Sequence, residues 1–340
     1  MTIGVGFLGC GPVAQAIHIP AIRALAADVA PVAFMDVNAE LAEQLALQQQ
    51  GTWTIDEDEL IANPAVDVVV IGSPNAHHAR QIIKACRAGK RAVLAEKPLA
   101  VSREELIDIR SAAVESGTRI VVGAMHAYDS AFIDAKGAWS ALGESPTDIE
   151  VVAFLVSNDV MVDSATQLMR SAAPVGGPPI NVPDVTAMTA GILGLASHDI
   201  PLIREFVPQT PELIAANRQR PAGYALQGVV STCAVSIIGM LPMQWSPDWT
   251  LRVVSENAVL QVVFQPSYVL ATGCRASLTV DGITRTWHSD ESPYVAEWRH
   301  LRAELAGDSP LYGLDRVSAD LEYALDLIAQ LPTLVDGDAA

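Results

Sequence analysis

The sequence predicts an α/β protein in which a doubly wound parallel sheet is followed by an α+β domain with a mostly antiparallel open sheet. Three observations predict this fold. Strand and helix patterns alternate regularly through residues 1–124, and a glycine-rich turn joins the first strand to the first helix. Beyond residue 124 the strand-like segments lengthen, with turn signals rather than helices between them. We therefore expect two domains, 1–124 and 125–340.

Each element of the first domain has its own local signal. β-Branched runs such as Val66–Ile71 predict parallel strands that are covered on both faces. Between the strands lie segments rich in helix formers, and Ser102 with Glu105 forms a capping box for a helix that ends at Gly117. The expected strands are 3–8, 32–35, 52–55, 66–71, 92–94 and 119–122, and the expected helices are 14–27, 39–49, 56–61, 76–88 and 102–117.

The second domain is expected to consist mainly of strands. Asp281-Gly282 is a hairpin signal, and the four prolines and two glycines of Ala173–Thr186 predict a long loop or flap. An amphipathic pattern over 314–331 predicts a final helix that packs back on the body of the protein. The expected strands are 149–156, 225–238, 250–254, 258–264 and 276–280.

Composition excludes several classes of function. Half of the 340 residues are apolar, which excludes a disordered chain, and no apolar stretch is long enough to span a membrane. The formal net charge of −18 repels phosphate backbones and makes nucleic acid an unfavourable partner. The first strand begins without a leader-like segment, and the four cysteines lack paired spacing. We therefore expect a soluble, cytoplasmic protein with reduced thiols.

The glycine-rich turn has a dinucleotide-binding pattern. It reads G-x-G-x-x-A between a strand and a helix, which is the arrangement of a Rossmann fold. The second strand ends at Asp36, whose carboxylate can accept the ribose hydroxyls and would repel a 2′-phosphate. We therefore expect NAD(H) as the cofactor, with NADP(H) disfavoured. The nucleotide-binding residues expected in the turn are Gly9, Gly11, Pro12, Val13 and Ala14.

Two further strand ends are expected beside this turn, because ligands of open α/β sheets bind beyond the carboxyl ends of the strands. They are the segments 72–78 and 95–98. Lys97 follows a buried strand, at the rim where a nicotinamide is expected to lie; a solvated surface lysine is the alternative. The residues that we expect to contact the cofactor here are Ser73, Pro74, Asn75, His78, Glu96 and Lys97.

These motifs resemble those of the Gfo/Idh/MocA oxidoreductases, the group typified by glucose–fructose oxidoreductase and inositol dehydrogenase. In the second domain the segment GILGLASHDIPLIREF, residues 191–206, resembles the family segment that carries the catalytic histidine. The N-terminal resemblance is carried by the glycine motif with His18 and Pro20, by Ser73-Pro74-Asn75-x-x-His78, by Gly89-Lys90 and by Glu96-Lys97-Pro98.

The resemblance implies oxidation of a hydroxyl, or reduction of a ketone, on a sugar, aminosugar or cyclitol-like substrate. It also implies that the open sheet of the second domain forms subunit contacts, so we expect a homodimer or homotetramer. By position, Lys97 would bind the reacting oxygen and His198 would exchange its proton. Coming from different domains, the two should face each other across the cofactor cleft. The Asp that the family commonly has four residues before this histidine is Gly194 here.

The residue types fit that chemistry. Histidine suits proton transfer because its unperturbed pKa is about 6.5, and a lysine ammonium stabilises a developing alkoxide. The alternative for His198 is a capping or packing role at a helix start. No histidine has ligand spacing with Cys, Asp or Glu, so we expect no metal. Candidates for substrate contact are His126 and Tyr128, which alternate in an expected extended segment, together with Asn158 and Asp199.

Ordinary packing or solvation is the alternative for each of these substrate candidates, and for Asp199 it is a carboxylate at a helix N-terminus. Two other functions also stay open at this point. One is lyase or glycosidase chemistry in which NAD is recycled within a turnover, and the other is a non-catalytic cofactor-binding sensor. Gly194 favours the sensor, whereas the presence of both Lys97 and His198 favours an enzyme.

Overall fold

The computed structural model describes residues 2–25, 28–156, 158–169, 182–241 and 248–335. Contacts group the chain into two compact units, each assembled from separate stretches. The first unit begins with Met1–Gly123, next to the expected boundary, but it also takes in two later stretches that the sequence assigns to the second domain. The first unit is Met1–Gly123, Val162–Val175 and Tyr294–Leu321, and the second is Ala124–Met161, Gly176–Pro293 and Glu322–Ala340.

The first unit is built on a parallel sheet of β1 (Ile3–Leu8), β2 (Val29–Met35), β3 (Thr52–Thr54), β4 (Val68–Ile71), β5 (Ala92–Ala95) and β6 (Arg119–Val122). Its order, β3-β2-β1-β4-β5-β6, confirms the doubly wound fold. β4 and β5 are buried along their whole length, as strands covered on both faces should be. The helices are α1 (Ile19–Ala24), α2 (Ala39–Gln49), α3 (Glu57–Ala62), α4 (His78–Arg87) and α5 (Arg103–Ser116).

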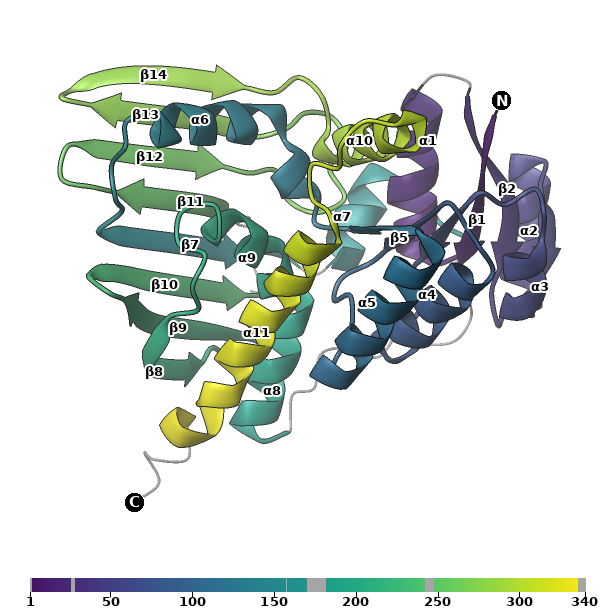
Figure 1. The fold of residues 1–340 in the computed structure, drawn as a ribbon, viewed down its shortest axis with the longest axis horizontal. Helices are drawn as coiled ribbons and strands as arrows, with labels where there is room; N and C mark the ends of the chain where they lie inside the picture. Colours follow the sequence, from purple (N-terminus) through teal and green to yellow (C-terminus); the bar gives the residue numbers. More distant parts are fainter. Residues whose placement is uncertain (1, 26–27, 157, 170–181, 242–247, 336–340) are drawn as a thin grey trace. The chain divides into compact units, whose positions relative to one another are not determined.

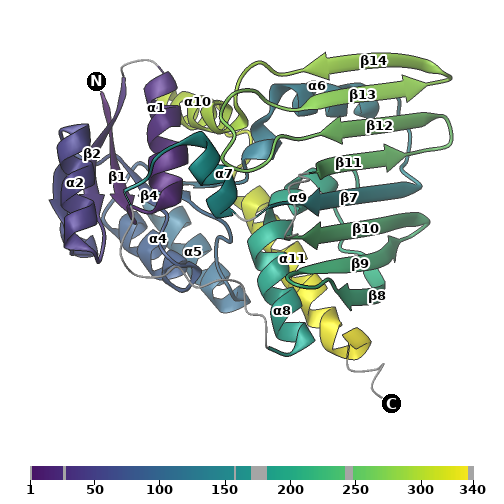
Figure 2. The same ribbon diagram turned by 180° about the vertical axis from the view of Figure 1, so that it is seen from behind.

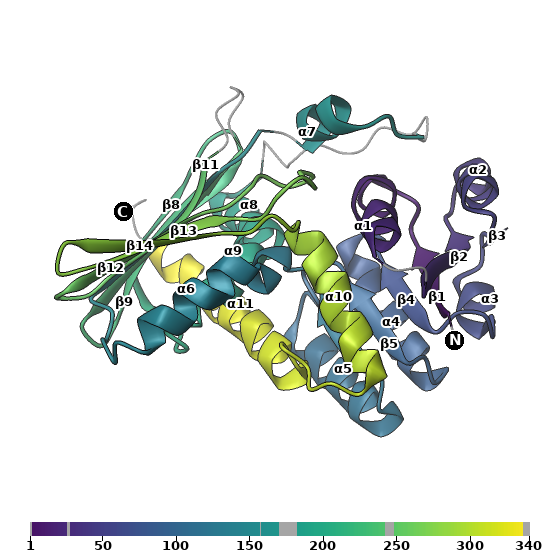
Figure 3. The same cartoon turned by 90° about the horizontal axis from the view of Figure 1, so that it is seen from above.

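These helices lie on both sides of the sheet: Figure 3 shows α1 and α2 on one side and α3, α4 and α5 on the other. The predicted helix ends of α5 are confirmed. The Ser102 hydroxyl accepts a hydrogen bond from the N–H of Glu105, and Gly117 has the left-handed φ of 71° that ends the helix.

The helix after the glycine turn differs from the prediction. Residues 14–27 were expected to form one α-helix, but Ala14–His18 form a π-helical segment, η1, in which the N–H of Ile19 bonds to the carbonyl of Ala14 five residues back. α1 follows and ends at Ala24, because Leu25 is extended. Such π segments are frequent at functional sites, and this one directly follows the glycine turn.

The second unit is built on a sheet in the order β14-β13-β12-β11-β7-β10-β9-β8, which reads from top to bottom in Figures 1 and 2. Among the described strands β7 and β10 pair in parallel, and the other neighbours are antiparallel, which confirms the predicted sheet type. The strands are β7 (Asp148–Phe154), β8 (Glu212–Arg218), β9 (Gly223–Val230), β10 (Cys233–Met240), β11 (Asp248–Val254), β12 (Ala258–Val263), β13 (Arg275–Val280) and β14 (Ile283–His288).

The positions of two turns test two of the predictions for this sheet. The hairpin at Asp281-Gly282 is confirmed, since both residues have positive φ, 48° and 79°, between β13 and β14. The expected single strand 225–238 is wrong. The chain reverses at Ser231, whose φ is 55°, and β9 pairs with β10 as a hairpin. Ser231 and Thr232 stand between apolar residues without a Gly, Pro, Asn or Asp beside them, so no strong turn signal is present in the sequence here.

Helices cover one face of the second sheet. α6 (Ser130–Ser140) packs on β12–β14, α8 (Asp184–Gly191) on β8 and β9, and α9 (Ser197–Ile203) on β7, all on the same side in Figure 3. On β7 alternate residues such as Val151 are buried, whereas Val152 and Phe154 are half-buried on the opposite face. Figure 3 shows none of the described helices of this unit on that face.

The remaining described elements are η2 (Asn75–His77), η3 (Met125–Tyr128), η4 (Ile192–Ala196), α7 (Asn158–Ala165), α10 (Pro293–Ala306) and α11 (Leu314–Val335). The predicted loop over 173–186 lies largely outside the described residues, and its last residues already belong to α8. The helix predicted over 314–331 is α11, four residues longer and divided between the two units after Leu321. No helix in the described part of the chain combines the length and apolar character that a membrane span requires.

Candidate functional site

The glycine turn leaves room for a dinucleotide. Gly9 has a φ of 100°, and a Cβ there would lie 2.8 Å from the backbone of Gly72, so the turn accepts no side chain at this position. A Cβ on Gly11 would meet no atom within 4 Å. Open space above a backbone at a helix start is what a pyrophosphate needs, and these residues therefore fit the group.

The two glycines predict opposite mutant phenotypes. Gly9→Ala should lower the free energy of unfolding of the nucleotide-free protein by at least about 1–2 kcal/mol, the cost of a left-handed conformation for an L-residue. Gly11→Ala should leave that stability nearly unchanged but weaken dinucleotide binding by roughly tenfold or more, or about 1.4 kcal/mol. Urea unfolding and nucleotide titration of both variants check this, and equal phenotypes would contradict it.

Asp36 is bound to the glycine turn. Its Oδ2 accepts a hydrogen bond of 2.9 Å from the N–H of Cys10, and its Oδ1 accepts one of 2.9 Å from the N–H of Asn38. The carboxylate thus joins the end of β2 to the end of β1. Each carboxylate oxygen keeps acceptor capacity for a further donor.

The loop after β4 is held at the same edge of the sheet. The Ser73 hydroxyl donates to Gln81 Oε1 at 2.6 Å, and Asn75 lies in η2. The buried His78 ring lies between two carbonyl oxygens, with Nε2 2.8 Å from Ser73 O and Nδ1 2.8 Å from Pro98 O. A neutral imidazole can donate to one of these oxygens and an imidazolium to both. His78 thus links the loop after β4 to the segment after β5.

Glu96 and Lys97 follow β5 directly. Burial lowers the pKa of Lys97, and the negative charge of Glu96 acts in the opposite direction. Burial alone would raise the pKa of Glu96, but the hydrogen bond from His18 and electrostatic interactions with nearby groups, the adjacent Lys97 among them, outweigh it and lower this pKa. The Glu96 carboxylate is therefore ionised beside a lysine in a partly desolvated position.

A second group of predicted residues comes together in the second unit. His126 in η3 and His198 in α9 have ring centroids 6.5 Å apart, and the Trp249 indole lies 4.4 Å from His126 and 5.5 Å from His198. Phe264 closes the group 4.5 Å from His126. Burial lowers the pKa of His126 to about 3, so this ring is neutral. His126 therefore contributes an uncharged ring to the wall beside His198.

Asp199 is buried beside His198. It lies in the first turn of α9, as expected, but its Oδ1 accepts a 2.7 Å hydrogen bond from the Trp249 indole N–H. Burial raises the pKa of Asp199 to about 7, and the Trp249 hydrogen bond opposes this rise. Burial and the Asp199 charge both raise the pKa of Tyr224. This carboxyl group thus changes charge near neutral pH within an otherwise aromatic wall.

The other substrate candidates have different surroundings. The expected extended segment at His126 and Tyr128 is wrong: these residues form a 3₁₀ turn and both are buried. Polar residues alternate here with a period of two, which is typical of a strand. The sequence pattern therefore did not indicate a 3₁₀ turn. Asn158 is exposed at the start of α7.

One contact in the cofactor half had no signal in the sequence. The Gln15 amide, one residue after the glycine motif, donates to Met169 O at 2.9 Å and accepts from Met169 N at 2.9 Å. It also donates to Cys10 O at 2.8 Å. Gln15 therefore fixes residues 166–169 beside the nucleotide-binding turn, at a cavity of about 170 Å³.

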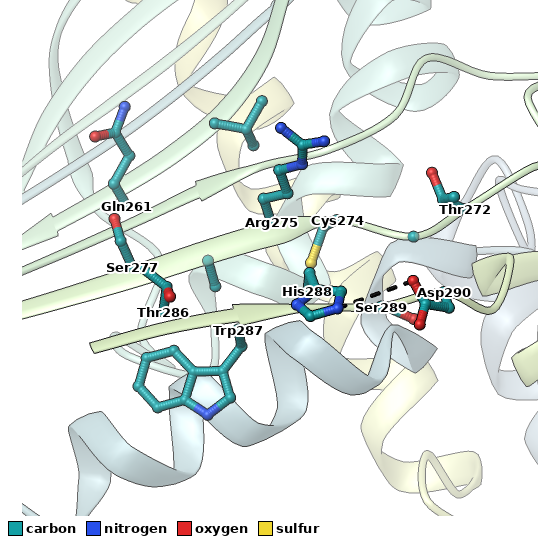
Figure 4. A pocket seen from close by; sticks show the side chains of 13 residues that line it. Gln261, Thr272, Cys274, Arg275, Ser277, Thr286, Trp287, His288, Ser289 and Asp290 are labelled. Atoms are coloured by element: carbon teal, nitrogen blue, oxygen red, sulfur yellow. Dashed lines mark ion pairs between the residues drawn. The ribbon is translucent and has the colours of Figure 1, made fainter. Parts of the chain in front are cut away.

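A larger cavity, of about 520 Å³, lies on the second sheet, and none of the predicted site residues lines it. Gln261, Ser277 and Thr286 neighbour one another across its strands. Figure 4 shows these polar side chains with Arg275 and His288, which is 3.9 Å from Asp290. This hollow belongs to the open sheet and is separate from the histidine group.

Comparison with known proteins agrees with the motifs. Residues 3–124 match the Gfo/Idh/MocA family, described as an oxidoreductase family with an NAD-binding Rossmann fold. The chain is 34% identical over 139 residues to an inositol 2-dehydrogenase of Gluconacetobacter diazotrophicus, covering 40% of this chain and 41% of that protein. It is 36% identical over 122 residues to a 1,5-anhydro-D-fructose reductase of Ensifer adhaerens, covering 36% and 35%. These matches span about two fifths of the relatives' length or less.

Solved structures share the fold over nearly the whole chain. An aldose-aldose oxidoreductase from Caulobacter crescentus, complexed with glycerol, superposes with a TM-score of 0.76 at 17% identity, covering 98% of both chains. A 3-ketoreductase from Actinomadura kijaniata, in complex with NADP, gives a TM-score of 0.75 at 16% identity with the same coverage. Residues 3–124 thus match the Gfo/Idh/MocA oxidoreductase family, and the fold shared with these solved structures extends over nearly the whole chain.

Proposed function

We propose that this protein is an NAD(H)-dependent oxidoreductase that interconverts a hydroxyl and a ketone on a sugar, aminosugar or cyclitol-like substrate. The observation that carries the proposal is the position of Lys97. It follows β5 at the sheet edge where Gly11 leaves open space and where Glu96 supplies a negative charge beside it. The relatives named as an inositol dehydrogenase and an anhydrofructose reductase support the substrate class.

The chain's own residues supply charge and proton transfer. A bound nicotinamide dinucleotide would accept or donate the hydride. In the proposed mechanism Gly9–Ala14 and Asp36 hold the dinucleotide, and the Lys97 ammonium binds the reacting oxygen, where it stabilises negative charge that develops during the reaction. His198 takes the hydroxyl proton during oxidation and returns it during reduction. Burial among His126, Trp249 and Asp199 limits the positions open to its ring.

The proposal is tested by a screen of NADH absorbance over sugars, inositols, keto-inositols and aminosugar precursors. Substrate-dependent formation or consumption of NADH supports it. Turnover of a sugar substrate without net change in NADH would instead indicate lyase or glycosidase chemistry with internal recycling. Tight NAD(H) binding without turnover of any of these compounds would favour a cofactor-binding sensor.

NAD(H) should bind more tightly than NADP(H), because the Asp36 carboxylate would repel a 2′-phosphate. Asp36→Ala should narrow the difference in affinity, since it removes that charge and frees the N–H groups of Cys10 and Asn38. Titration with both nucleotides measures this. Glu40→Ala, which removes an exposed charge from the first turn of α2, is the matched control and should not alter the preference. Tighter binding of NADP(H) by the wild-type protein would contradict the prediction.

The protein should form a homodimer or homotetramer through the open face of its second sheet. That face carries half-buried apolar side chains, such as Val152 and Phe154, and none of the described helices of its unit. Apolar surfaces of this kind are usually covered in an assembly. Light scattering at micromolar concentration checks the mass, and a monomer would count against this interface.

A further inference from the structure

A line of three side chains leads from α10 to the residue before Lys97. The Trp298 indole N–H donates to His18 Nδ1 at 3.1 Å, and His18 Nε2 lies 3.2 Å from Glu96 Oε1. Trp298 and His18 are each 1% exposed, and the Glu96 side chain is 16% exposed. All three belong to the first unit, although 280 positions separate Trp298 from His18.

The donor and acceptor roles along this line are determined by Trp298. An indole N–H can only donate, so His18 Nδ1 must accept and carries no proton. The ring proton of neutral His18 is therefore on Nε2, where it donates to Glu96. Protonation of Nδ1 would place two N–H groups against each other inside the protein, at the cost of an unsatisfied buried donor. Trp298 thus selects one neutral tautomer of His18.

The end of the line is shaped to hold a carboxylate. A Cβ on Gly123 would lie 3.0 Å from Glu96 Oε1, so the residue after β6 leaves just enough room for this side chain. The charged or titratable groups that face Glu96 are His18 from η1, His78 from α4 and the adjacent Lys97. His18 lies within hydrogen-bond distance of the carboxylate, at 3.2 Å.

We infer that Trp298 and His18 are positioning residues for Lys97: they hold the Glu96 carboxylate ionised and in place, and this anion keeps the Lys97 ammonium protonated. The inference rests on the proposed function for its catalytic meaning, because a charged Lys97 is what the reacting oxygen requires. The expected effect on the charges of Glu96 and Lys97 does not depend on which substrate binds.

The test is the substitution Trp298→Phe, which keeps an aromatic ring and removes the N–H. Without the donor, Nδ1 loses its anchor, so the His18 ring is free to turn and its Nε2–H can leave Glu96. The carboxylate should then take up a proton or turn away, and Lys97 should lose its proton at a pH about one unit lower, as expected for loss of an adjacent opposite charge. NMR of labelled lysine and of the histidine nitrogens measures both effects in the nucleotide-free protein.

Controls separate this role from simple packing. Trp53→Phe removes an exposed indole from β3 of the same unit and should change neither signal. His18→Gln, whose amide can accept from Trp298 and donate to Glu96, should restore the Lys97 titration that His18→Leu loses. Glu96→Gln should lower the Lys97 pKa even if Trp298→Phe fails to fold.

An unchanged hydrogen bond from His18 Nε2 to Glu96 together with an unchanged Lys97 titration in Trp298→Phe would overturn the inference, as would an unchanged Lys97 titration in Glu96→Gln. The NMR signals can be measured without turnover. A protein that fails to catalyse the proposed reaction would therefore still test whether Trp298 and His18 position Glu96. Where turnover is found, the basic limb of the pH–rate profile should move to lower pH in Trp298→Phe, with the KM for the nucleotide unchanged.

Discussion

Lys97→Ala is expected to lower kcat/KM by about 10²–10³-fold, the usual loss when one donor to a developing oxyanion is removed. Affinity for NAD(H) should stay within a few-fold, because the proposed role of the ammonium lies in the transition state. We expect activity to fall because burial weakens the hydration of the Lys97 ammonium, while the negative charge of Glu96 favours its charged form. Steady-state kinetics together with nucleotide titration measure the two quantities separately.

Lys84→Ala is the matched control for this substitution. It removes the same charge from the same unit, but Lys84 is bound to Glu57 at 2.8 Å and to Asp58 at 2.6 Å on α3. Turnover should survive in this variant. Two results would contradict the assignment of Lys97: activity close to wild type in Lys97→Ala, or a loss of nucleotide affinity as large as the loss of kcat/KM.

Asp199→Asn is expected to remove a large pH dependence of stability from the second unit. The folded-state pKa of Asp199 is about 7, against about 3.9 in an unfolded chain. Between these values the folded protein keeps a proton that the unfolded chain has lost, so stability falls as the pH rises and levels off above the folded pKa. Three units of pKa correspond to about 4 kcal/mol.

Urea unfolding at pH 5 and pH 8, followed by tryptophan fluorescence, measures this effect because Trp249 is bonded to Asp199. The asparagine amide oxygen introduced by the substitution can accept the same hydrogen bond without titrating. Compared with the wild type, the variant should therefore lose much less stability between the two pH values. Asp248→Asn, an exposed carboxylate on β11, should behave like the wild type. Equal pH dependence in wild type and Asp199→Asn would show that Asp199 is ionised throughout.

Sequence patterns predict well the elements whose signals are local. β1 and α2 have the predicted bounds because an apolar run and a helix-forming run each begin and end at clear turn signals. The nucleotide turn is equally local, since Gly9 and Gly11 act through their own backbone. The doubly wound parallel sheet followed from the regular alternation of strands and helices.

The surroundings of the two candidate groups could not be predicted in this way. Trp249 in β11 and Phe264, just after β12, pack against His126 from positions more than a hundred residues later in the chain. The pattern of a strand does not indicate which aromatic ring its side chains will contact. Trp298 had no signal because a buried aromatic residue in a helix is ordinary core by sequence. The hydrogen-bond partner of a buried polar atom often lies far away in the sequence. A sequence pattern identifies the polar residue but not its partner.

Because the first unit is assembled from separate stretches of the chain, a single recombination event cannot replace the second unit alone. A single crossover after residue 123 would bring in a foreign second unit and, with it, a foreign segment in place of 294–321. His18 would then meet whatever residue the new chain offers in place of Trp298. Exchange of the second unit without loss of this pair therefore requires a further junction ahead of α10, or matched changes at positions 18 and 298.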